Sequence, residues 1–85
     1  MKLLVLKSSA AKALDTVAQP HRSRLAEELA AYALGKPCDT KAMAGTPTVR
    51  MRVGDYRIVF DETATTILVL AIGHRREIYR QEYRQ

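Results

Sequence analysis

The stretch RMRVGDYRIVFDE, residues 50–62, alternates basic and apolar side chains before a Gly-Asp pair and continues after it with the β-branched and aromatic run YRIVF. Both patterns indicate β-strands, and a Gly-Asp pair between them is typical of a tight hairpin turn. With Gly54 and Asp55 as the loop, the predicted cross-strand pairs are Val53 with Tyr56, Arg52 with Arg57, Met51 with Ile58, and Arg50 with Val59. Because paired residues and alternate residues share a face, this register places the arginines together on one side of the sheet.

Two further apolar runs predict strands. TTILVLAI, residues 65–72, is a continuous apolar run of the kind found in a central strand buried on both faces. KLLVL, residues 2–6, is short and ends at a Lys-Ser-Ser break, so it fits a buried strand better than a helix. With DETAT, residues 61–65, as a second turn, we expect successive antiparallel strands from residue 48 to residue 72.

The segment between the first strand and the hairpin predicts two helices and a loop. Ser8 or Ser9 can cap a helix that runs to about Val17. A second helix covers about residues 20–34, with Gly35 at its C-terminal cap and its charged residues on a solvated face. Residues 35–47 are rich in turn formers and predict one substantial loop. The expected fold class is therefore α+β, a helical hairpin packed on a mainly antiparallel sheet.

Length and composition limit what the chain can do. Its 85 residues predict a single domain, residues 1–85, with no room for a deep cofactor cleft. Fourteen Lys and Arg against nine Asp and Glu give a net charge of +5, which favours anionic partners. The single cysteine, Cys38, suits a reducing compartment. The N-terminal apolar run is too short for a signal peptide or a membrane span, so we expect a cytoplasmic protein that does not contact the membrane.

The arginines predicted on one face would repel each other, and like charges opposite each other on a ladder destabilise a sheet. A bound ligand or acidic side chains would offset this cost, and guanidinium groups bind phosphate bidentately. The C-terminal run HRREIYRQEYRQ, residues 74–85, adds cations with interleaved aromatic rings, a combination that suits single-stranded nucleic acid. The alternative is that the arginines extend into water or form surface ion pairs with Asp55, Asp61 and Glu62. Equally, His74 can be a capping residue and Tyr79 a residue that packs on the sheet.

AGTPTVRMRVGDYRIVFDE, residues 44–62, followed by ILVLAIGHRREIYR, residues 67–80, closely resembles the C-terminal half of RelE-family toxins of bacterial type II toxin–antitoxin modules, within the RelE/ParE superfamily. The resemblance rests on the G-D-Y-R turn combined with G-H-R and a following Tyr-Arg. It implies a RelE-like fold and an endoribonuclease that cleaves mRNA on the ribosome without a metal or cofactor. It also implies a cognate antitoxin that neutralises the toxin and is its only link to operator DNA.

The resemblance also assigns four candidate catalytic residues, Arg50, Arg57, Arg75 and Tyr79. His74 is added to the catalytic candidates because the intrinsic pKa of histidine lies near the operating pH. The neighbouring cations Arg52, Arg76 and Arg80 are the candidate RNA-binding residues. Some family members carry a basic residue at the position that Thr48 occupies in this chain. Threonine cannot act as a general base, so proton transfer is expected from Tyr79 or His74.

Two other functions are compatible with the same fold. ParE toxins of this superfamily act by binding DNA gyrase without cutting RNA. A toxin fold that has lost its activity could instead serve only as an antitoxin-bound, DNA-binding repressor subunit.

Overall fold

The computed structural model describes residues 1–82, with side chains as far as residue 78. The elements are β1 (Leu3–Leu6), α1 (Ser8–Thr16), α2 (His21–Ala33), β2 (Thr40–Ala42), β3 (Thr48–Val53), β4 (Tyr56–Glu62), β5 (Thr66–His74) and α3 (Arg75–Glu82). The strands form one five-stranded sheet in the order β1-β5-β4-β3-β2. β1 runs parallel to β5 and the other neighbouring pairs are antiparallel, so the α+β prediction of a mainly antiparallel sheet is confirmed.

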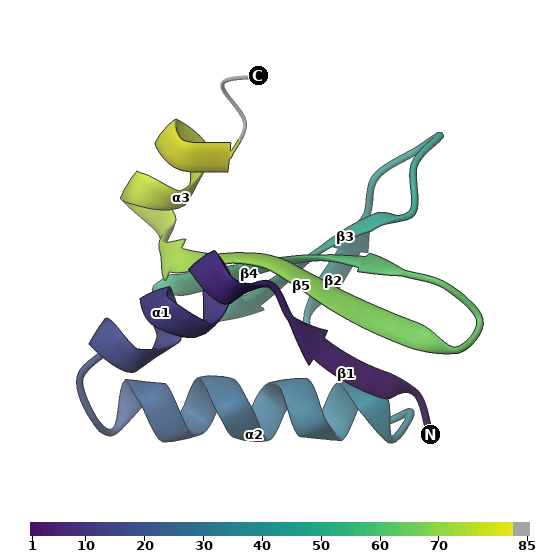
Figure 1. The fold of residues 1–85 in the computed structure, drawn as a ribbon, viewed down its shortest axis with the longest axis horizontal. Coiled ribbons are helices and arrows are strands. Elements are labelled where there is room, and N and C mark those ends of the chain that lie inside the picture. The colour runs from purple at the N-terminus through teal and green to yellow at the C-terminus, as the bar shows by residue number, and fades with distance from the viewer. Residues whose placement is uncertain (83–85) are drawn as a thin grey trace.

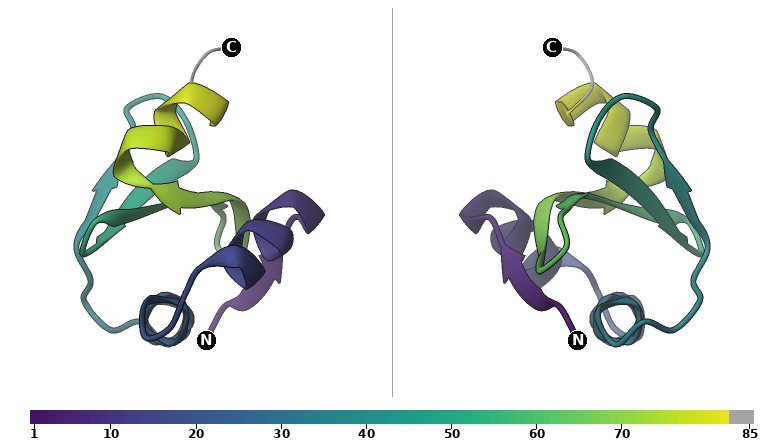
Figure 2. Two further views of the ribbon diagram at one scale, coloured as in Figure 1. Left: turned by 90° about the vertical axis from the view of Figure 1, so that its left-hand side faces the viewer. Right: turned by 90° about the vertical axis from the view of Figure 1, so that its right-hand side faces the viewer.

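The helices cover the two faces of this sheet unequally. α1 and α2 lie on one face, and α3 lies on the other near the end of β5 (Figures 1 and 2). We call the α3 side the arginine face. None of the helices within residues 1–82 is both long enough and apolar enough to cross a lipid bilayer.

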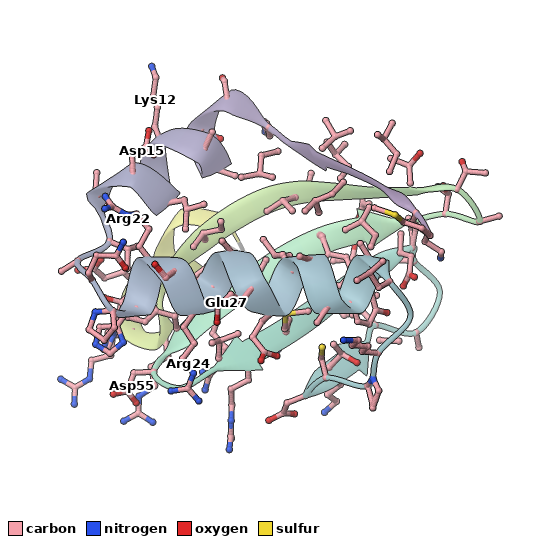
Figure 3. All side chains as sticks on the ribbon, turned by 90° about the horizontal axis from the view of Figure 1, so that it is seen from below. Lys12, Asp15, Arg22, Arg24, Glu27 and Asp55 are labelled. Atoms are coloured by element: carbon pink, nitrogen blue, oxygen red, sulfur yellow. The ribbon has the colours of Figure 1, made fainter. Side chains whose placement is uncertain are left out.

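The main core lies between the sheet and the helical hairpin. Alternation along β3 and β4 turns Met51, Ile58 and Phe60 towards the helices, where all are fully buried. Leu25 and Leu29 lie one helical turn apart on α2 and complete this core. The charged residues of the helical hairpin formed by α1 and α2 point outward, as Lys12 and Glu27 show (Figure 3). The predicted solvated face of α2 is thus confirmed.

The hairpin has the predicted register. Val53 pairs with Tyr56 and Arg52 with Arg57, on either side of Gly54 and Asp55. Gly54 has a φ of +60°, and no other residue type in the described part of the chain has a positive φ. A positive φ at only the first loop position is typical of a type II′ turn, which strongly prefers glycine there.

Several local predictions were wrong. The loop predicted at residues 35–47 contains strand β2, whose three residues are too few to show a periodic pattern. β1 is an edge strand rather than a buried one, with Leu3 64% exposed. β5 is an interior strand next to the edge strand β1, and Leu68 on its arginine face remains 36% exposed because α3 covers only part of that face. Neither Ser8 nor Ser9 caps α1, since Lys7 occupies the cap position without a side-chain bond.

A second, smaller core attaches α3 to the arginine face. Ile78 is 1% exposed and packs on Val59 of β4 and Ala71 of β5, with Leu70 beside them. The ladder between β4 and β5 shifts register beyond Val59, where Leu70 is an additional residue of β5. The main-chain N–H of Arg75 donates to the carbonyl of Asp55 at 2.8 Å, so the start of α3 is fixed against the hairpin turn.

Candidate nucleic-acid interface

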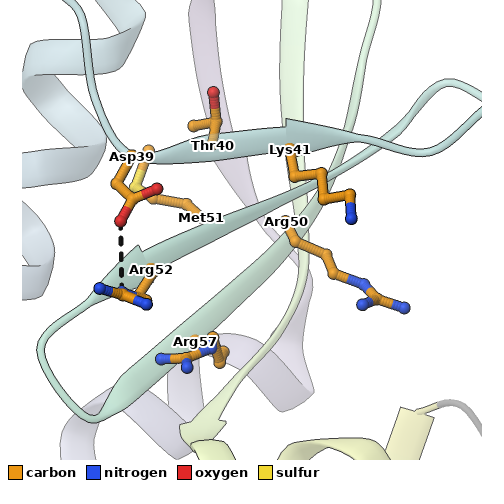
Figure 4. A pocket seen from close by; sticks show the side chains of 7 residues that line it. All are labelled: Asp39, Thr40, Lys41, Arg50, Met51, Arg52 and Arg57. Atoms are coloured by element: carbon orange, nitrogen blue, oxygen red, sulfur yellow. Dashed lines mark ion pairs between the residues drawn. The ribbon is translucent and has the colours of Figure 1, made fainter.

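Basic side chains from three strands meet on the arginine face. Arg52 lies opposite Arg57 on β3 and β4, and Lys41 of β2 lies opposite Arg50. They surround a hollow of about 220 Å³, which we call the basic hollow (Figure 4). Its lining residues are Asp39, Thr40, Lys41, Arg50, Met51, Arg52 and Arg57. The sheet therefore concentrates four cations where the sequence predicted three.

The predicted counter-charges do not balance these arginines. Asp61 accepts a hydrogen bond from the Thr48 hydroxyl at 2.7 Å, and Glu62 pairs with Lys2 at the far end of β4. The acid that does reach the cluster is Asp39, whose Oδ2 lies 3.2 Å from Nε of Arg52. Both side chains of this pair are more than 60% exposed, so the pair adds about 0–1 kcal/mol to stability. Among the residues that line the basic hollow, basic side chains thus outnumber acidic ones.

The Arg57 guanidinium is held close to the turn. Its Nη1 donates to the carbonyl oxygens of Tyr56 at 3.1 Å and Gly54 at 3.3 Å. Each of these bonds is made to backbone that the hairpin already fixes, so the side chain loses little further freedom when it binds a ligand. Arg57 is therefore a preorganised cation at the edge of the basic hollow.

Lys41 was missed by the sequence analysis. It lies in β2, within the segment that the sequence analysis predicted as a loop. Lys41 lies opposite Arg50 because β2 pairs with β3. It also lines a second hollow of about 410 Å³, which we call the side hollow. The side hollow is lined by Lys41, Ala42, Met43, Ala44 and Arg50, so the two hollows share Lys41 and Arg50.

His74 lies on the other face of the sheet. It pairs with Tyr56, whose side chain belongs to the helix-facing set, whereas Gly73 is the residue opposite Arg57. The Tyr56 ring contacts both His74, at 5.7 Å between centroids, and His21 at the start of α2, at 5.4 Å. The Nδ1 of His74 accepts a hydrogen bond from the main-chain N–H of Arg76 at 3.3 Å. The structure therefore does not bring His74 together with Arg50 and Arg57.

The remaining predicted residues belong to α3. Arg75 and Arg76 are exposed in its first turn, and the bond from Arg75 to Asp55 holds that turn beside the hairpin. The side chains of Tyr79 and Arg80 lie outside the described residues, so their predicted roles stay predictions. Thr48 does share the arginine face, as expected, and its hydroxyl bonds to Asp61.

Away from this face, one polar cluster ties β1, α2 and β4 together. Glu62 accepts hydrogen bonds from Lys2 at 2.6 Å and from the Tyr32 hydroxyl at 2.7 Å. The bond from Lys2, with that from Tyr32, lowers the pKa of Glu62 even though partial burial opposes the shift. Burial and the bond to Glu62 raise the pKa of Tyr32 to about 12. These shifts follow from contacts that join Lys2, the residue before β1, and Tyr32 of α2 to the end of β4.

Metal chemistry has no evident site in the described part of the chain. Among the side chains of residues 1–78 no three His, Cys, Asp or Glu gather as metal ligands. Cys38 is partly buried, and burial together with its contact to Glu28 raises the pKa of its thiol, so its reactive thiolate form is disfavoured.

Comparison with known proteins identifies the family. A family model described as the ParE toxin of the type II toxin–antitoxin system, parDE, matches residues 4–79. The chain belongs to this toxin family. The toxin is thus a member of the RelE/ParE superfamily, in agreement with the resemblance seen in its sequence.

Solved structures show the same fold. The toxin is similar to a chain of the RelB-RelE antitoxin-toxin complex from Methanococcus jannaschii, with a TM-score of 0.76, 25% identity, and coverage of 92% of this chain and 98% of that one. A chain of the RelE-RelB complex from Pyrococcus horikoshii gives a TM-score of 0.70 at 22% identity, covering 87% and 94%. A chain of the RelBE2 complex from Mycobacterium tuberculosis gives a TM-score of 0.67 at 16% identity, with coverage of 87% of this chain and 91% of that one. No curated protein sequence matches the toxin.

Proposed function

We propose that the toxin is a ribosome-dependent mRNA endoribonuclease that inhibits translation in the cytoplasm. The observation that carries this proposal is the basic hollow, whose lining holds four cations, Lys41, Arg50, Arg52 and Arg57, and the acid Asp39. Like charges so close together are costly for a folded sheet, and a phosphodiester backbone offsets the cost because it supplies negative charge.

The cations account for one part of the chemistry. Cleavage at a 2′-hydroxyl builds negative charge on the phosphorus oxygens, and fixed guanidinium groups stabilise that charge without reorganisation. In our proposal Arg57 and Arg75, which the bond to Asp55 keeps near each other, hold the scissile phosphate, while Arg50 orients the RNA. These cations perform the charge neutralisation that a metal ion performs in other nucleases, so no cofactor is needed.

Proton transfer requires a different side chain. Arginine has a pKa above about 12 and is a poor base near neutrality. His74 faces the other side of the sheet, which leaves Tyr79 as the stronger of the two candidates. We propose that Tyr79, which follows the buried Ile78 by one position, acts in proton transfer or stacks on a base.

The basic hollow is also the surface that we expect a cognate antitoxin to cover. The similar archaeal and mycobacterial chains are described in complexes with antitoxins. For this toxin we propose a cognate antitoxin whose acidic or amphipathic segment covers the basic hollow and through which alone the complex reaches operator DNA. Complementary charge would also make that association fast.

Induction of the toxin, followed by mapping of transcript 5′ ends on ribosomes, tests the nuclease directly. We expect new 5′ ends with the unaltered chain and a loss of about 10²–10³-fold with Arg57→Gln, as for removal of one preorganised charge-stabilising group. Arg24→Gln, on the exposed side of α2, is the matched control and should cleave normally. Absence of new ends, or normal cleavage by Arg57→Gln, would refute the proposal.

The family description favours one competing function. The matching model is named for ParE, and inhibition of DNA gyrase is the alternative that the sequence resemblance implies. A gyrase inhibitor would block replication while leaving transcripts intact. Measuring DNA synthesis and transcript integrity in the same induced culture separates the two functions.

A further inference from the structure

The basic hollow and the side hollow are adjacent. They share Lys41 and Arg50, which face each other across the β2–β3 ladder, and the side chains of both extend the same way from the sheet (Figure 4). Beyond these two cations the lining changes in character, from charged residues in the basic hollow to Ala42, Met43 and Ala44 in the side hollow.

We infer that the side hollow is a nucleoside subsite, which receives the base and ribose next to the phosphate bound in the basic hollow. Lys41 is its positioning residue, since it stands at the boundary between the two. This inference rests on the proposed function, because it requires that the basic hollow bind RNA.

The chemistry of a single RNA strand fits this alternation. Along the strand, anionic phosphates alternate with flat and largely apolar bases, so a binding groove must alternate cations with apolar walls. At about 410 Å³ the side hollow is the larger of the two, and its alanines leave it open. Met43 adds a polarisable thioether suited to contact with an aromatic base. The Arg50 guanidinium offers a plane on which a base can stack.

Lys41 differs from the arginines in the task it can perform. An ammonium is a compact point charge on a flexible stem, which suits the non-bridging oxygens of a phosphate and not the planar edge of a base. Its position opposite Arg50, at the boundary of the two hollows, allows it to contact the phosphate that joins the bound nucleoside to the basic hollow. Removal of Lys41 should therefore weaken binding of any sequence equally.

Two probes of equal charge separate the base from the phosphate. The full-length toxin is titrated by fluorescence anisotropy, at low salt and at several higher salt concentrations, with labelled oligouridylate and with an abasic ribose-phosphate oligomer of the same length. We expect the unaltered toxin to bind oligouridylate about 3–10-fold more tightly, because only this probe can fill the side hollow. Ala44→Leu, which fills part of that hollow from an exposed loop position without adding an aromatic ring, should erase this preference and leave binding of the abasic oligomer unchanged.

Lys41→Gln gives an independent readout. Loss of one phosphate contact should reduce the slope of log affinity against log salt by about 0.7 for both probes. Lys12→Gln, on the outer surface of α1, is the matched control and should keep the original slope (Figure 3). Equal thermal melting of the variants would show that each one folds.

The outcomes distinguish the subsite from the proposed function. Equal affinity of the unaltered toxin for both probes, a base preference retained by Ala44→Leu, or failure to bind either probe at low salt would overturn the subsite. If ribosomal transcripts still acquire new 5′ ends in that case, the nuclease proposal survives without it. If no new ends form, the nuclease proposal fails on its own evidence.

Discussion

The attachment of α3 to the sheet depends on one side chain, and Ile78→Ala tests this. Ile78 is 1% exposed and belongs to a core whose other buried members are Val59 and Ala71. An eight-residue helix is too short to be stable by itself, so its order depends on this contact and on the bond from Arg75 to Asp55. Truncation removes three carbons at about 0.8 kcal/mol each, or about 2.5 kcal/mol of docking free energy.

We expect this loss to appear as local opening of α3 and not as global unfolding. By hydrogen exchange, about 2.5 kcal/mol corresponds to about 60-fold faster exchange of the α3 amides, while the amides of β3 and β4 keep their protection. The proposed nuclease activity should fall as well, because Arg75 would leave the hairpin.

Leu29→Ala is the matched comparison. Leu29 is equally buried but lies in the main core, so its truncation should cost about 2–5 kcal/mol and accelerate the protected amides together. If Ile78→Ala behaves like Leu29→Ala, or if its α3 amides exchange at the original rate, the reasoning about a separately anchored helix is wrong.

Three further predictions concern the hairpin, the polar cluster and the basic hollow. Gly54→Ala places a side chain at a φ of +60° and should lower the free energy of unfolding by about 1–2 kcal/mol, measured by urea denaturation. Because folding lowers the pKa of Glu62, the unfolded chain binds a proton at this side chain more readily than the folded chain does. The free energy of unfolding should therefore fall as the pH drops below about 4.5. Glu62→Gln should weaken this pH dependence, measured by thermal melting at several pH values. Asp39→Asn releases Arg52 and should tighten binding of a single-stranded oligoribonucleotide several-fold at low salt, with stability changed by less than about 1 kcal/mol; weaker binding would contradict the view of Asp39 as a competitor of phosphate.

The sequence alone determined the central hairpin. Its register follows from Gly54-Asp55 and from alternation along β3 and β4, both of which act between residues close in the chain. The grouping of Arg50, Arg52 and Arg57 on one face follows from that register. The G-D-Y-R and G-H-R spacing also indicated the superfamily, which the match over residues 4–79 confirms.

Only the tertiary structure decided what surrounds those arginines. Lys41 joined them because β2 pairs with β3, and three residues of strand carry too little local signal to reveal a pairing made across a loop. His74 does not lie among them because the pairing of β5 with β4 places Gly73 opposite Arg57 and His74 opposite Tyr56, on the other face of the sheet. Both outcomes are set by contacts between distant segments, which a local pattern does not encode. Residue types and spacing therefore predicted the arginines of the hollow, whereas strand pairing decided which other side chains share their face.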